Sequence, residues 1–265
     1  MFDFLLLLIS LLLVLSAPII SRAQADTIRP GKTPLVTAAL KPGLKQYLVY
    51  FQDPKRERIL GMWFWMRDIA VETHNGVKSF TIRQNWYGSD TNSYRSVYSI
   101  NSMDDFAPIY HSETIRGKTS AYNWNGAFIS GADSVEGNTK KDFHLTFDAP
   151  NLNWNLDIET FEMLPLAEGK SFLINFYDAG LTPPEYILYK VTGSEAITLM
   201  DGRKTDCWKL TTEGNHNGRA YSETYWISKS THEFLKEEDS FGGTYRYKIK
   251  MPAMAPDFRQ KFARS

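Results

Sequence analysis

Alternation of hydrophobic and polar side chains is the clearest pattern in this chain, and it predicts β-strands. In residues 141–147, Phe143, Leu145 and Phe147 fall on one side of an extended backbone, and polar residues fall on the other. This strand is expected to have one buried and one solvated face. We expect further strands, rich in β-branched and aromatic residues, at 47–51, 59–71, 77–87, 93–100, 109–115, 120–124, 127–129, 171–177, 186–191, 205–212, 220–227, 232–238 and 244–251.

Pairs of turn-forming residues separate several of these strands. Asn75-Gly76 joins two β-rich runs, and the same device recurs at Asn125-Gly126, Asp201-Gly202 and Gly242-Gly243. A type I′ turn needs a positive φ at both central residues, which Asn, Asp and Gly tolerate. Sequential hairpins of short strands predict a mainly β fold, an antiparallel meander forming a curved, unclosed barrel.

One stretch has the period of a helix. Between Leu156 and Leu164, apolar and small residues recur three or four positions apart, and Pro165 then ends the pattern. We therefore expect one short helix that covers part of the sheet.

The strand at residues 61–67 differs from the others because both of its faces are apolar. Met62, Phe64 and Met66 point one way, and Trp63 and Trp65 point the other way. A second apolar face must be covered by the helix, by another sheet or by a ligand. These five residues are the candidate ligand-binding residues.

The N-terminal segment has the character of a signal peptide. An apolar run from Leu5 to Leu15 is followed by the small-x-small pattern Ala23-Gln24-Ala25. Residues 1–25 are therefore expected to be removed, and the mature chain to begin at Asp26 in the periplasm or outside the cell. Because Asp3 is the only charge before the run, an uncleaved anchor helix is the alternative.

The remaining chain divides into an arm, one domain and a tail. Residues 26–44 are rich in Pro and Gly and are expected to form a lead-in arm or linker. Residues 45–251 are expected to form a single β-rich domain. Residues 252–265 contain two prolines and three basic residues, and we expect this C-terminal tail to fray.

Composition excludes several partners. The chain has 265 residues, 30 basic and 30 acidic side chains, and no net charge. This balance argues against nucleic-acid binding and against an electrostatic anchor to anionic lipid. Cys207 is the only cysteine, so no intramolecular disulfide forms, and no cysteine at the cleavage site carries a lipid. We expect no stable membrane insertion after signal cleavage.

Motifs for catalysis and cofactors are absent from the sequence. It contains no Gly-x-Ser-x-Gly, no phosphate-binding loop, and no metal-binding spacing among its histidines, which are His74, His111, His144, His216 and His232. We expect no cofactor, no metal and no enzymatic activity, and we expect Cys207 to be a free thiol. A catalytic pair of carboxylates stays open, with candidates at Glu223, Glu237, Glu238 and Asp239.

Seven tryptophans are spread over the whole chain, and three explanations for them remain open. They fill the core of a large sheet, they line an apolar ligand cavity, or they form a platform on which sugars stack.

Three stretches resemble an uncharacterised family of exported bacterial proteins that carry a domain of unknown function. They are the helix-to-glycine segment 159–169, the segment 191–210 with its Cys207-Trp208-Lys209-Leu210 strand, and the strand–turn–strand segment 225–236. This family is similar in architecture to the LolA-like periplasmic lipoprotein carriers. The resemblance implies a half-barrel whose apolar cavity binds acyl chains, with Leu156–Leu164 as the covering helix.

These observations lead to one main hypothesis and two alternatives. We expect an exported, non-enzymatic envelope protein that binds an apolar or amphipathic, lipid-like ligand on the concave face of the sheet. The first alternative is a secreted glycan-binding module or glycosidase. The second is a scaffold that pairs with other envelope proteins through an open sheet edge.

Overall fold

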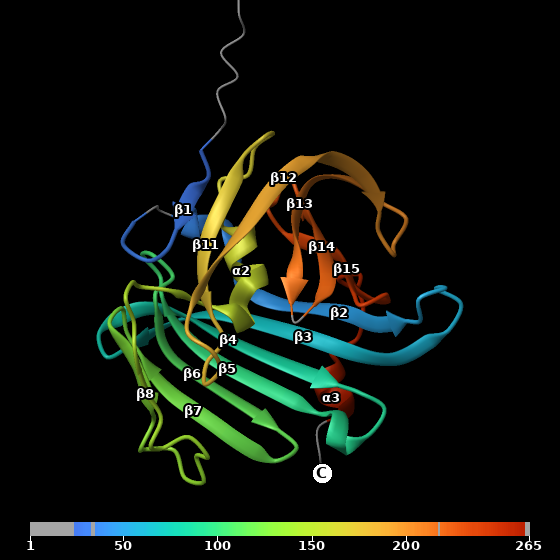
Figure 1. Ribbon diagram of the computed structural model, residues 1–265. Helices are drawn as coiled ribbons and strands as arrows, with labels where there is room; N and C mark the ends of the chain where they lie inside the picture. The colour runs from blue at the N-terminus through green and yellow to red at the C-terminus, as the bar shows by residue number, and fades with distance from the viewer. Residues whose placement is uncertain (1–23, 33–34, 217, 263–265) are drawn as a thin grey trace, which may run out of the picture.

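The computed structural model describes residues 24–32, 35–216 and 218–262 (Figure 1). The apolar run of the predicted signal peptide lies outside these residues. The first run of strands is β1 (Asp26–Ile28), β2 (Gly43–Gln52), β3 (Ile59–His74), β4 (Val77–Tyr87), β5 (Arg95–Ser102), β6 (Pro108–Ile115), β7 (Lys118–Trp124), β8 (Phe128–Gly131) and β9 (His144–Thr146). The second run is β10 (Leu152–Asn153), β11 (Ser171–Tyr177), β12 (Glu185–Thr198), β13 (Lys204–His216), β14 (Arg219–Ser228), β15 (Phe234–Phe241) and β16 (Thr244–Lys250).

These strands form one large, curved, unclosed sheet, which confirms the predicted mainly β fold. Its order is β1-β11-β12-β13-β14-β15-β16-β2-β3-β4-β5-β6-β7-β8-β9, and β10 also pairs with β11. The prediction of one continuous meander is corrected in two respects. The second run precedes the first in the sheet because β16 pairs with β2, and β1 and β10 pair with β11 in parallel. Both edges of the path, β1 and β9, are only three residues long.

The two positive φ values that a type I′ turn needs are present at two of the four turns. Both central residues have positive φ at Asn75-Gly76 (49° and 81°) and at Gly242-Gly243 (57° and 90°). At Asp201-Gly202 only the glycine has a positive φ, and at Asn125-Gly126 neither residue does. There the Asn125 side chain accepts hydrogen bonds from the backbone N–H groups of Ala127 and Phe128, so a side-chain-stabilised turn replaces the expected one.

The expected short helix lies inside the hollow of the curved sheet (Figure 1). A 3-10 turn, η3 (Trp154–Leu156), leads into α2 (Asp157–Glu162), and Met163 caps its C-terminal end before Pro165. Five of the six α2 residues are buried. The helix is therefore a central part of the core, packed between the two runs of strands, with Phe161 against Tyr189 and Tyr225.

A buried ion-pair cluster holds α2 to the sheet. Arg67 on β3 donates from Nε to Glu159 Oε1 at 2.8 Å and from Nη1 to Glu162 Oε1 at 3.3 Å. Lys45 on β2 donates to Glu162 Oε2 at 2.9 Å. Arg67 and Glu159 are fully buried, so each charge depends on its partners for solvation.

The arm expected at residues 26–44 is built into the sheet and core. β1 pairs with β11, and Ile28, Leu35 and Leu40 are buried in the main core cluster. A 3-10 turn, η1 (Thr37–Ala39), connects this segment to β2. Apolar residues spaced along the arm thus outweigh the turn-forming Pro and Gly residues that suggested a linker.

The C-terminal tail is ordered on the outer face of the sheet through residue 262, where we had expected fraying. The ring of Phe258, the first residue of α3 (Phe258–Phe262), stacks on Phe64 at a centroid distance of 4.3 Å. Gln46 Nε2 donates to the carbonyl of Pro256 at 3.0 Å, and Arg259 forms an ion pair with Asp68. The tail is held because it covers the outward apolar position of β3.

In the part of the chain that the structure describes, no helix is long and apolar enough to span a bilayer.

Candidate functional site

The five candidate ligand-binding residues on β3 lie in three different environments. Trp65 and Met66 are buried, Trp63 and Phe64 are half-buried, and Met62 is 48% exposed. The Trp65 ring stacks on Trp86 at 4.8 Å, and its Nε1 donates to Gln84 Oε1 at 3.1 Å. Protein side chains therefore cover both faces of this strand at its centre.

A hollow on the concave side of the sheet offers room for a ligand. This inner pocket has a volume of about 430 Å³. It lies between β2, β11, β12 and β14–β16, beside η3. Its lining residues are Phe51, Trp154, Phe176, Asp178, Leu181, Thr182, Pro183, Glu185, Ile187, Tyr221, Glu223, Asp239, Ser240, Phe241 and Arg246.

Part of the lining of the inner pocket is apolar. Phe51 and Trp154 face it together with Phe176 and Ile187, and the rings of Trp154 and Phe176 lie 5.4 Å apart. Phe51 also contacts Trp63 edge to face at 5.4 Å. Through this contact the predicted residue Trp63 borders the pocket without lining it.

Charged side chains lie among these apolar ones, because Arg246 pairs with Phe51 across β16 and β2, and Glu185 pairs with Phe176 across β12 and β11. Arg246 donates to Glu237 Oε1 at 2.9 Å and forms an ion pair with Asp239, and Lys248 lies 2.7 Å from Glu237 Oε2. Glu223 accepts a hydrogen bond from the Tyr225 hydroxyl at 2.6 Å. Glu223 and Asp239 are directly opposite each other on β14 and β15, so their carboxyl groups extend from one spot on the sheet.

Burial alters the acidity of these carboxyl groups. Loss of water raises the pKa of Glu223 to about 7, and the negative charge of Glu237 acts in the same direction. Burial also raises the pKa of Asp239 and of Asp178. Near neutral pH, Glu223 can therefore donate as well as accept a hydrogen bond.

Strand alternation separates the four acidic residues that the sequence offered as catalytic candidates. Glu223 and Asp239 line the inner pocket, and Glu237 is fully buried behind it. Glu238 points to the outer face, where it forms an ion pair with Arg56 at 2.9 Å. The structure thus brings Glu223 and Asp239 together at the pocket.

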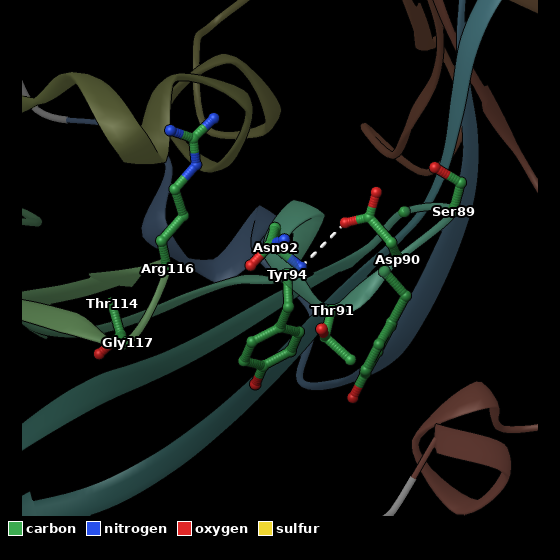
Figure 2. A pocket seen from close by; sticks show the side chains of 10 residues that line it. Ser89, Asp90, Thr91, Asn92, Tyr94, Thr114, Arg116 and Gly117 are labelled. Atoms are coloured by element: carbon green, nitrogen blue, oxygen red, sulfur yellow. Dashed lines mark hydrogen bonds between the residues drawn. The ribbon is translucent and has the colours of Figure 1, made fainter.

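A second hollow, of about 850 Å³, lies at the ends of β4–β7 (Figure 2). It is formed by the loop after Tyr87, the turn η2 (Thr91–Ser93) and the β6–β7 turn at Arg116-Gly117. Figure 2 shows the Tyr94 ring and Thr114 on one side of the strands and Arg116 on the other. Asp90 Oδ1 accepts from the backbone N–H groups of Asn92 and Ser93, which explains the local loop geometry without a ligand.

A buried polar network on β5 and β6 was missed by sequence reasoning. His111 Nδ1 lies 2.9 Å from Ser99 Oγ and 2.9 Å from Asn153 Nδ2, and all three side chains are buried. Burial lowers the pKa of His111 to about 3, so the ring is neutral. Neither Ser99 nor His111 lines one of the hollows described above, and we assign the network a structural role.

Metal and thiol chemistry receive no support from the described residues. Within them, no three His, Cys, Asp or Glu side chains are grouped so that they could hold a metal ion. Cys207 is buried among Trp226 and Leu235, and burial raises the pKa of its thiol to about 11.

Comparisons with known proteins give a family and one structural likeness. The family described as "Protein of unknown function (DUF3108)" matches residues 46–250. A solved β-barrel-like protein from Brucella abortus, with the domain of unknown function DUF1849, is 9% identical in sequence. The match covers 79% of this chain and 97% of that chain, with a TM-score of 0.49. No curated protein matches the chain.

Proposed function

This chain belongs to the DUF3108 family, whose function is unknown, and we propose that it is a non-enzymatic protein that binds an amphipathic, lipid-like ligand in its inner pocket. The observation that carries this proposal is the mixed lining of the pocket, in which aromatic rings lie beside charged side chains. A ligand with an apolar chain and a polar end would contact both kinds of side chain.

The size of the inner pocket suits a small molecule or one chain of a lipid. Its volume of about 430 Å³ falls within the range of roughly 300–1,000 Å³ that is usual for ligand pockets. Each buried methylene contributes about 0.8 kcal/mol, and association costs about 4–15 kcal/mol. Because the pocket is already formed in the folded chain, little of the binding energy is needed to order its walls.

The charged side chains of the lining favour a particular kind of polar end. Four carboxyl groups line the inner pocket, those of Asp178, Glu185, Glu223 and Asp239, against the single cation Arg246. Arg246 already has carboxylate partners in Glu237 and Asp239. A head group that carries hydrogen-bond donors or a positive charge is therefore favoured over an anionic one.

The location that we propose is the cell envelope, after export. Supporting this, the first strand of the fold, β1, begins at Asp26, where the mature chain is predicted to start. Asp26 also forms an ion pair with Lys170 at 2.8 Å, so the predicted new terminus is part of the structure. Sequencing the N-terminus of the protein recovered from an envelope fraction tests this, because cleavage predicts Asp26 and an uncleaved anchor predicts Met1.

Ligand binding is tested by calorimetric titration with amphiphiles that share a dodecyl chain, below their micelle concentrations. We expect dodecyltrimethylammonium to bind more tightly than dodecanoate. Leu181→Trp places a large ring at the pocket rim and is expected to weaken binding, whereas Met200→Trp, on an exposed turn, is expected to leave it unchanged. Equal binding by both variants would remove the inner pocket as the site.

One observation favours a second candidate function, glycoside binding or hydrolysis. Glu223 and Asp239 are opposed across two strands in an aromatic-lined pocket, and retaining glycosidases use two carboxyl groups about 5–5.5 Å apart. The raised pKa of Glu223 suits a general acid. Burial outweighs the attraction of Arg246 and raises the pKa of Asp239 to about 6, so this second carboxyl group is still mostly ionised at neutral pH.

The two candidates are separated by an assay for reducing ends released from cell-wall and plant polysaccharides. Hydrolysis that is lost in Glu223→Gln would establish the second candidate. We expect no hydrolysis by the parent chain or by Glu223→Gln, and we expect Glu223→Gln still to bind the dodecyl amphiphile.

A further inference from the structure

The hairpin tip between β2 and β3 exposes an unusual run of aliphatic side chains. Ile59 is 62% exposed, Leu60 is 56% exposed and Met62 is 48% exposed. Single exposed apolar residues are common on soluble proteins, but three within four positions form a patch. In Figure 1 this hairpin, at the end of β2, projects beyond the rest of the sheet.

The tip lies beside the turn that borders the inner pocket. β16 pairs with β2, which places the β15–β16 turn beside the hairpin, and a Cβ on Gly243 would lie 3.7 Å from the Pro54 ring. Phe241, just before that turn, is 42% exposed and also lines the inner pocket. We call Ile59, Leu60, Met62 and Phe241 the apolar corner; Met62 lies on the outer face of the sheet and Phe241 on the inner face, so the corner includes both faces at this rim.

Cations flank the apolar corner although the whole chain is neutral. Lys55, Arg56 and Arg58 lie on the hairpin tip, and the guanidinium of Arg219 lies 6.0 Å from the Phe241 ring centroid. Arg56 forms an ion pair with Glu238 and Arg58 forms one with Asp53, and the two arginine side chains remain 46% and 78% exposed. Apolar side chains ringed by Lys and Arg are suited to the boundary between acyl chains and anionic head groups.

We propose that the apolar corner is a peripheral membrane-contact surface for a bilayer with anionic head groups. Ile59, Leu60, Met62 and Phe241 enter the boundary between head groups and acyl chains, and the flanking cations contact the head groups. This places the mouth of the inner pocket at the lipid surface. The use of that contact for loading a ligand rests on the proposed function, but the contact itself does not.

Shape favours a membrane over a protein partner or a second copy of the chain. A projecting tip presents little flat area, whereas stable protein interfaces bury about 800 Å² on each partner. A fluid bilayer adapts to a narrow tip and buries its side chains from all sides.

The test is co-sedimentation of the full chain with vesicles of equal parts phosphatidylglycerol and phosphatidylethanolamine, compared with phosphatidylcholine vesicles. The double variant Ile59→Ser/Leu60→Ser changes two exposed side chains and is expected to fold. We expect it to lower the affinity for the anionic vesicles roughly tenfold or more. The matched control Met200→Ser removes an equally exposed apolar side chain elsewhere and is expected to bind as the parent chain does.

Binding to phosphatidylcholine is expected to be weaker, and added salt is expected to weaken binding to the anionic vesicles. The proposal is overturned if the parent chain does not sediment with anionic vesicles, or if the double variant sediments equally well. It is also overturned if sedimentation equilibrium shows that the double variant abolishes self-association instead.

Titration of the same proteins with dodecyltrimethylammonium separates this proposal from the proposed function. Amphiphile binding without vesicle binding would contradict only the membrane contact. Vesicle binding without amphiphile binding would contradict only the ligand site.

Discussion

At the scale of single residues, buried ion pairs between the sheet and α2 hold this helix inside the hollow of the sheet. Arg67 lies between Glu159 and Glu162, and none of the three side chains is more than 1% exposed. Such a cluster adds little to stability over apolar packing of the same volume, but the removal of one member leaves uncompensated charge. Arg67 therefore fixes where the helix lies.

We predict that Arg67→Met lowers the free energy of unfolding by about 3–5 kcal/mol, because the buried Glu159 loses its cation and Glu162 keeps only Lys45. Arg83→Met is the matched control, since Arg83 pairs with Glu72 at 3.7 Å on the surface. That change is expected to cost about 0–1 kcal/mol. Urea denaturation measures both, and equal losses would show that the buried cluster does not hold the helix.

The Glu223 carboxyl group is expected to make stability depend on pH. Burial raises its pKa from 4.5 to about 7, so the folded chain binds this proton more tightly than the unfolded chain does. Between about pH 4.5 and pH 7 the folded state therefore loses stability as pH rises, by an amount on the order of 3 kcal/mol.

Glu223→Gln removes this titration and keeps an acceptor for the Tyr225 hydroxyl. The variant should gain stability relative to the parent chain as pH rises through that window. Glu168→Gln, an exposed change outside the pocket, is the control. Thermal unfolding at several pH values measures this effect. A stability difference between variant and parent that does not change with pH would refute the raised pKa of Glu223.

Cys207 is expected to react slowly with thiol reagents. The side chain is fully buried, and burial raises the pKa of the thiol to about 11, so little thiolate is present near neutral pH. Titration with a chromogenic disulfide should label the folded chain much more slowly than the denatured chain. Cys207→Ser should cost about 1–3 kcal/mol in stability because it buries a hydroxyl, and it should leave ligand binding intact.

At the scale of elements, strands were predictable where their own side chains carry the signal. β4 and β11 begin and end where alternation predicted, and the short helix falls within its predicted range. β1 and β10 were missed because they are two or three residues long and are strands only through pairing with β11. The strand propensity of these residues does not indicate which strand they pair with.

The order of the sheet was not predictable from hairpins. Hairpin signals connect strands that are adjacent in sequence, whereas the β16–β2 pairing joins residues about two hundred positions apart. The tail is a similar case. Its prolines suggested fraying, but the Phe258 ring stacks on the Phe64 ring on the outer face of the sheet and holds the tail there.

We predict that Phe258→Ala destabilises the protein by about 1–3 kcal/mol, since the ring covers Phe64 at the protein surface. Met254→Ala is the control in the same segment, because Met254 is 87% exposed. Chemical denaturation compares the two, and a loss no larger than that of the control would mean that the tail is not part of the stable fold.

At the scale of the whole molecule, the inner pocket exists because the sheet curves and brings several of its strands around one hollow. Its lining combines Phe51 from β2, Trp154 from η3 and Arg246 from β16, which are far apart in the sequence. The sequence prediction of Met62–Met66 as ligand-binding residues rests on local alternation, which carries no information about a pocket that curvature forms. Acidic residues on otherwise apolar strand faces, as at Glu223 and Asp239, were the available signal for the pocket.

The central claim is that the inner pocket holds an amphipathic molecule, and native mass spectrometry of the protein recovered from a bacterial envelope tests it most directly. The account predicts a bound mass of lipid size on the parent chain and on Met200→Trp. Leu181→Trp, which obstructs the pocket rim, is predicted to lose that mass while remaining folded. Parent protein recovered from the envelope with no bound mass, or an equal bound mass on Leu181→Trp, would contradict the claim.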